Sequence, residues 1–271
     1  MKSNKLFITI SGAVIGIIAV LLVKFGNPAN MGFCIACFIR DTAGALKLHS
    51  APIVQYIRPE IIGLVLGSSI VAFAKKELIA RTGSNPLIRF VLGFFVMIGA
   101  LMFLGCPLRM MLRIGGGDFN AIIGLVGFVI GIGIGILALN KGFSLNRSYK
   151  VSSSESIVFP IIQIIFLAIL VLAPSLLAFS SEGPGSMHAP ILISLAAGLI
   201  VGGLAQRTRF CTVAGIRDSI MFKEFSMLYG FIALIVITVI VNLVFGYFNP
   251  GFEAQPVAHT DGLWNCLGMA L

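Results

Sequence analysis

Residues 30–45, Asn-Met-Gly-Phe-Cys-Ile-Ala-Cys-Phe-Ile-Arg-Asp-Thr-Ala-Gly-Ala, decide the fold. The segment is too short to cross a bilayer, which takes about 20 apolar residues, yet it lies among segments that are long enough. It also carries adjacent charges, Arg40 and Asp41, which are costly at membrane depth. This combination predicts a short helix held inside a membrane protein, because non-spanning backbone at that depth is tolerated only within protein or along a cavity.

A second copy of this unit occurs 177 residues later. Residues 209–223 read Arg-Phe-Cys-Thr-Val-Ala-Gly-Ile-Arg-Asp-Ser-Ile-Met-Phe-Lys. The sequence therefore predicts a duplication, with a first repeat over residues 1–150 and a second over residues 151–271. The residues that coincide are Cys34 with Cys211, Arg40 with Arg217, and Asp41 with Asp218.

The composition is that of an integral membrane protein. Of the 271 residues, 58% are hydrophobic and only 11% are charged, whereas a soluble domain has about 25% charged residues. The formal net charge is +9, but the Lys and Arg residues are scattered between apolar runs as topology signals are. Nucleic-acid binding is therefore not expected, and the lipid bilayer is the expected partner. The predicted fold class is all-α and polytopic.

Apolar stretches locate the predicted membrane-spanning helices. The first follows two lysines without an Ala-x-Ala cleavage site, so a retained helix is predicted rather than a signal peptide. The glycines at 124–135 predict close helix packing and not a nucleotide loop. The predicted spans are residues 6–23, 90–108, 119–140, 156–181, 190–205 and 225–252, with a shorter one at 61–74 and the beginning of another at 262–271.

Three segments that interrupt the spans are predicted to be re-entrant half-helices: residues 30–45, 105–118 and 207–223. The middle one begins Gly105-Cys106-Pro107 and ends in a run of glycines. Proline suits the first turn of a short helix, and glycines end it. Arg109 and Arg113 fall on one face of this helix. They suit either the mouth of an anion path or contact with lipid headgroups.

The placement of Lys and Arg predicts the orientation. With the N-terminus in the cytoplasm, the basic loops at 75–89, 141–150 and 207–223 lie inside, and loops 182–189 and 249–261, which contain no Lys or Arg, lie outside. An odd number of spans then separates the two Phe-Cys units, so the units enter the membrane from opposite sides. Such an inverted repeat of broken helices forms a transport site near the midplane.

The repeat offset also predicts that the second repeat is C-terminally incomplete. The counterpart of the Gly-Cys-Pro unit at 105–109 would fall beyond Leu271, where the sequence ends.

Four cysteines are candidate site residues: Cys34, Cys37, Cys106 and Cys211. Each is either a small hydrophobe in the packing or a contact for the substrate. Cys34 and Cys37 form a Cys-x-x-Cys, but a structural zinc site takes four nitrogen or sulfur ligands and no second pair is evident. No metal or cofactor is therefore expected.

The two Arg-Asp pairs also have two interpretations. The aspartate either neutralises the arginine and caps a half-helix, or the arginine adds positive potential that attracts an anion. Because no paired carboxylates occur within the spans, a proton-relay antiporter is not expected.

The motif Gly-Phe-Cys-x-x-x-x-Phe/Ile-Arg-Asp, followed by Gly-Cys-Pro-x-Arg and a glycine-rich turn, resembles the YeeE/YedE sulfur-transport family. Residues 30–41 are most similar to its YedE branch, which is associated with selenium metabolism. The resemblance covers essentially the whole chain except for the absent second Gly-Cys-Pro unit. It implies a bacterial inner-membrane importer of thiosulfate-like anions rather than an enzyme. In that family Cys34, Cys106 and Cys211 would lie on facing half-helices along a central path.

The chemistry of the thiol fits such a relay. A thiol is a weak donor and a soft acceptor, so a series of thiols can hold a sulfur or selenium anion and still release it. Two alternatives remain open. One is a membrane thiol–disulfide or sulfur-transfer enzyme that uses Cys34 and Cys37. The other is a membrane partner that recruits a cytosolic, TusA-like sulfur carrier through residues 207–223.

Overall fold

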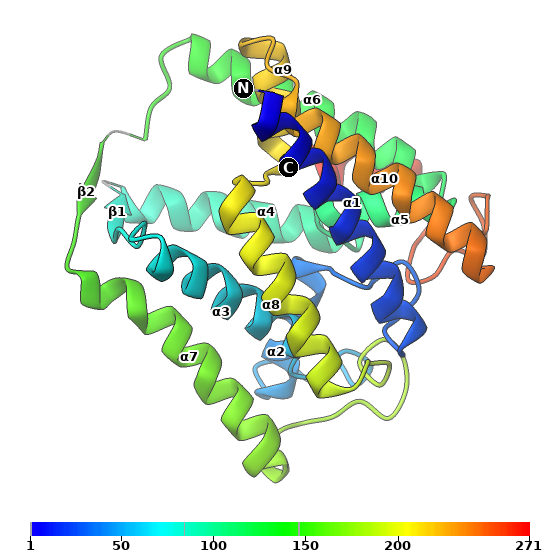
Figure 1. Ribbon diagram of the computed structural model, residues 1–271. Helices are drawn as coiled ribbons and strands as arrows, with labels where there is room; N and C mark the ends of the chain where they lie inside the picture. Colours follow the sequence, from blue (N-terminus) through cyan, green and yellow to red (C-terminus); the bar gives the residue numbers. More distant parts are fainter. Residues whose placement is uncertain (1, 84, 146) are drawn as a thin grey trace.

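The computed structural model describes residues 2–83, 85–145 and 147–271. It is 66% helix and 3% strand, and Figure 1 shows its helices in chain order. The longer helices are α1 (Lys2–Lys24), α3 (Pro59–Ala74), α4 (Pro86–Phe103), α6 (Asn120–Asn140), α7 (Ser153–Leu172), α8 (Ile191–Thr208) and α10 (Ser226–Phe245). The shorter ones are α2 (Ile35–Ala45), α5 (Pro107–Gly115), α9 (Thr212–Met221), α11 (Gly262–Ala270) and the 3-10 turn η1 (Pro174–Leu176).

The expected membrane character is confirmed. Within the described residues, six helical stretches are long and apolar enough to cross a membrane, and α3 is a shorter apolar helix of 16 residues. The outer surfaces of these helices are apolar as well. On α4, for example, Leu87, Phe90 and Phe94 are all exposed, as expected where lipid rather than water surrounds the helix.

Two helix pairs form the scaffold, α1 with α10 and α3 with α8. Glycines allow both pairs to approach closely. A Cβ atom added at Gly12 would lie 2.1 Å from the Gly230 carbonyl oxygen, and one added at Gly202 would lie 2.1 Å from the Leu64 carbonyl oxygen. In a bilayer, where helices gain little from the hydrophobic effect, such van der Waals contact is what holds them together.

The short helix α11 packs between α4 and α6. Gly99 on α4 and Gly268 on α11 meet backbone to backbone, and a Cβ at Gly127 on α6 would lie 2.0 Å from the Cys266 carbonyl oxygen. Part of the glycine-rich run at 124–135 is therefore a packing surface, as predicted. Gly133 and Gly135 of the same run face open space.

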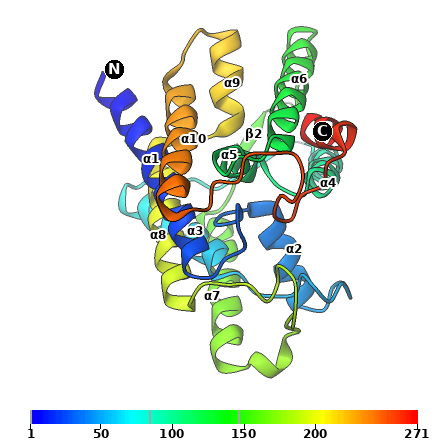
Figure 2. The same ribbon diagram turned by 90° about the vertical axis from the view of Figure 1, so that its right-hand side faces the viewer.

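The connections between helices gather in two groups. In one group, strand β1 (Arg81–Gly83) pairs antiparallel with β2 (Ser148–Lys150), and Arg209 forms an ion pair with Glu77 at 2.9 Å. In the other, a bridge joins Asp118 to Gly251. Loops that contact each other are those predicted to share a side of the membrane. The short helices α2 and α9 lie toward opposite ends of the molecule (Figure 2).

A substitution at a packing glycine tests the scaffold. Gly202→Val places methyl groups where the Leu64 backbone lies, and we expect the free energy of unfolding in detergent micelles to fall by about 1–3 kcal/mol. Gly133→Val, with nothing within 4 Å of its added Cβ, is the matched control and should leave it unchanged. Equal stability of the two variants would contradict this packing.

Candidate functional site

Three of the five cysteines lie together in the interior. Cys34, Cys37 and Cys106 are all buried free thiols in one apolar cluster with Met31 and Phe38. The Cys37 amide donates to Cys34 Sγ at 3.3 Å, and Cys106 packs in the same cluster. The cluster joins two segments of chain that the sequence separates by about seventy residues, so tertiary packing assembles it.

Short helices position these thiols. Cys34 is the residue before α2 and has extended backbone (φ −142°), and its sulfur accepts the Cys37 amide at the helix N-terminus. Cys106 stands in the same place before α5, where Pro107 opens the first turn. Two helix N-termini, each with a partial positive charge, therefore lie beside the thiols, and this arrangement favours an anion.

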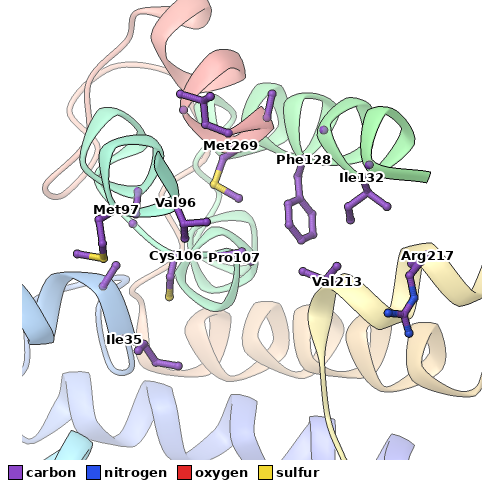
Figure 3. A pocket seen from close by; sticks show the side chains of 18 of the residues that line it. Ile35, Val96, Met97, Cys106, Pro107, Phe128, Ile132, Val213, Arg217 and Met269 are labelled. Carbon is purple, nitrogen blue, oxygen red and sulfur yellow. The ribbon is translucent and has the colours of Figure 1, made fainter. Parts of the chain in front are cut away.

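A cavity of about 680 Å³ lies beside the cluster. Figure 3 shows Cys106 and Pro107 on one side of it and Val213 and Arg217 of α9 on the other. Arg217 is the charged side chain among the described lining residues. The remaining wall is apolar and comes from α2, α4, α6 and α11, including Ile35, Val96, Met97, Phe128, Ile132 and Met269.

Arg109 lies against the thiol cluster and is fully buried. Its Nη1 approaches Cys37 Sγ at 4.0 Å and donates to the Leu104 carbonyl. Its Nη2 donates to the carbonyls of Pro256 and Val257, at 3.2 and 3.1 Å, in the loop before α11. Arg109 thus joins the thiols to that loop. Burial excludes the lipid-headgroup interpretation for Arg109.

Arg113, one turn further along α5, is also fully buried. It forms an ion pair with Asp118 at 2.6 Å and donates to the Phe103 carbonyl at 2.8 Å. Contact with lipid headgroups is excluded for this arginine too. Gly105, which begins the unit, lines the cavity, and a Cβ there would lie 3.0 Å from the Arg109 side chain.

The two Arg-Asp pairs have different environments. Asp41 is fully buried and accepts from Arg40 at 2.7 Å and from Arg58 at 2.8 and 3.0 Å. Arg58 is buried as well and also donates to two carbonyls of the loop before α8. In contrast, the ion pair between Arg217 and Asp218 (2.8 Å) is partly exposed. The first pair is therefore architectural, and the second places a cation at the cavity.

The contrast between the pairs gives a prediction. Asp41→Asn leaves the buried Arg58 without its carboxylate, and we expect a loss of about 3–5 kcal/mol in the free energy of unfolding. Asp218→Asn removes the matched but partly exposed carboxylate and should cost about 1 kcal/mol or less. Denaturation of both variants in detergent micelles measures the difference. Equal losses would show that the first pair is not the anchor described.

Cys211, the fourth predicted site cysteine, is not part of the cluster. It precedes α9 as Cys34 precedes α2, but its side chain is exposed and does not line the cavity. Val213 and Arg217 of the same unit do line it. The structure thus brings three of the four candidate cysteines together and places the fourth outside.

Sequence reasoning missed Glu60, a fully buried carboxyl group in the first turn of α3. Its signal was an acidic residue directly after Pro59 and directly before a long apolar run. That position is also usual for an exposed helix end, where a carboxylate favours the helix dipole. Only the packing of α3 against α8 turns it into an interior group.

Comparison with protein-family models, curated proteins and solved structures finds no match to this chain. The resemblance to the YeeE/YedE family therefore rests on the motifs alone.

Proposed function

We propose that this chain is a bacterial inner-membrane importer of a sulfur- or selenium-containing anion of the thiosulfate class. One observation carries the proposal: Cys106 belongs both to the wall of the cavity and to the buried cluster with Cys34 and Cys37. In this proposal an anion in the cavity meets Cys106 first and is handed on to Cys34, which lies in the same buried cluster.

The chemistry of the path supports a soft anion. Thiols are weak donors and soft acceptors, and apart from Arg217 the wall of the cavity is apolar. Positive potential comes from Arg217 at one side of the cavity and from the N-termini of α2 and α5 at the other. Binding that is favourable but not tight is what conduction requires.

We further propose that the short helices are re-entrant and that the chain is an inverted repeat. The helix packing supports this. In the proposed repeat, α1 corresponds to α8 and α3 corresponds to α10. Under this correspondence the packed pair α1–α10 matches the packed pair α8–α3. The same correspondence relates α2 to α9, and each begins directly after a cysteine. Their placement toward opposite ends agrees with entry from opposite sides (Figure 2).

With the N-terminus in the cytoplasm, the cavity would communicate with the inner side through Arg217. Arg109 and the loop that supplies the Pro256 and Val257 carbonyls would then close the outer side. This form of the protein would correspond to the release step, in which Cys106 borders the cavity. A cytosolic sulfur carrier, docked on the basic segment 207–223 next to the cavity, would be the acceptor.

Removal of the shared thiol tests the importer. Cys106→Ala should lower uptake of radiolabelled thiosulfate into proteoliposomes at least about tenfold, the effect of losing a contact of about 1.4 kcal/mol in the barrier. Cys266→Ala, which removes a thiol outside the cluster, is the control and should retain uptake. Uptake that is unchanged in Cys106→Ala would end the proposal. A parallel Cys211→Ala variant decides whether that exposed cysteine joins the path.

A thiol–disulfide or sulfur-transfer enzyme is the second candidate, because Cys34 and Cys37 lie in one buried cluster and the Cys37 amide contacts Cys34 Sγ. Cys37→Ser separates the two functions. Cys37 does not line the cavity, and serine retains a donor for the Leu104 carbonyl that the thiol now contacts at 3.8 Å. We expect the variant to import within about threefold of wild type, a change of less than 1 kcal/mol. Loss of both uptake and disulfide exchange would favour the enzyme.

A further inference from the structure

Glu60 is a buried carboxyl group with one oxygen left unpartnered. Its Oε1 accepts hydrogen bonds from Asn27 Nδ2 at 2.7 Å and from Ser194 Oγ at 3.0 Å. Its Oε2 is inaccessible to solvent and has no hydrogen-bond partner among the described residues. A carboxylate in this condition is costly, because neither water nor protein compensates half of its charge.

Among the residues that the structure describes, no side chain forms an ion pair with Glu60. Arg58, two residues earlier, directs its guanidinium nitrogens to Asp41 and to the carbonyls of Met187 and Pro184. The other titratable groups near Glu60 are Tyr56 and His188, whose rings stack on each other at 4.1 Å. Neither supplies a cation to Oε2. Within this region Asp41 forms ion pairs with two arginines, whereas Glu60 forms an ion pair with none.

We propose that Glu60 Oε2 takes up a monovalent cation, either a proton or Na⁺. The hydrogen-bond network that reaches the carboxyl group through Oε1 contains hard oxygens, which such cations prefer. Ser194 Oγ and Asn27 Oδ1 belong to the same hydrogen-bond network, as do the carbonyls of Gly32 and Ala189. Asn27 follows the end of α1, and Glu60 and Ser194 lie near the beginnings of α3 and α8.

The site connects directly to the thiol cluster. Asn27, which donates to Glu60, also donates to the carbonyl of Gly32, two residues before Cys34. Ile61, the residue after Glu60, packs within the cluster that contains Cys34 and Cys106. Binding of a cation at Glu60 would therefore affect the segment that positions Cys34. One consequence rests on the proposed function. If the protein imports an anion, the cation at Glu60 would enter with it and offset the charge of the anion against the membrane potential.

The proton arm of the test is an infrared measurement on the purified protein in lipid nanodiscs. A proton on Glu60 gives a carbonyl band of a protonated carboxyl group that disappears as the pH rises. Glu60→Gln should lose this band. Glu77→Gln, which removes a carboxylate at the protein surface, should keep it.

The sodium arm measures the thermal unfolding midpoint as NaCl replaces choline chloride at constant ionic strength. Bound Na⁺ stabilises the folded state, so the midpoint should rise in wild type and in Glu77→Gln but not in Glu60→Gln. A wild-type protein that has neither the band nor the sodium-dependent rise overturns the proposal.

A second variant covers the case in which Glu60→Gln does not fold. Ser194→Ala keeps the carboxyl group but removes one of the two donors to Oε1. The carbonyl band should then shift to higher frequency, or the sodium-dependent rise should shrink. No change in either signal overturns the site. Uptake in the absence of both signals would support the importer and refute the cation site. Either signal in the absence of uptake would support the cation site and refute the importer.

Discussion

Backbone carbonyls at the broken ends of helices are the constraint on which this structure depends. Inside a membrane protein no water satisfies them, so each one needs a donor from the chain itself. Buried arginines supply these donors. Arg113 bonds to the Phe103 carbonyl and Arg109 to that of Leu104, so two arginines of α5 complete the end of α4. Arg58 does the same for the loop before α8.

This solution explains why charge and sulfur lie side by side. A helix that breaks in the interior frees carbonyls at one end and amides at the start of the next helix. The arginines bind the carbonyls. Cys34 and Cys106 are the residues directly before α2 and α5, so they lie at the free amides of these helices. The interruption of the helices therefore places the sulfur atoms next to the positively polarised helix N-termini. Apolar side chains such as Phe38 exclude water from this region.

Much of this arrangement follows from the sequence, because apolar length and interrupting charge are local properties. The spans, the short helices and the neighbouring Cys34 and Cys37 could be predicted in that way. The full burial of Asp41 and the partial exposure of Asp218 could not be predicted, since both residues lie in the same motif. The difference comes from Arg58, which belongs to another segment. The exposed position of Cys211 and the interior position of Glu60 likewise depend on which helices pack nearby.

The pairing of β1 with β2 has one more consequence. Through this strand pair the chain leaves α3 and enters α7 at neighbouring points, so α4, α5 and α6 form an excursion that begins and ends at the same place. The portion that carries Cys106 and Arg109 is therefore tied to the rest of the chain at a single point by its ends. Its other attachments include side-by-side packing contacts, of α4 and α6 with α11 and of α5 with α10.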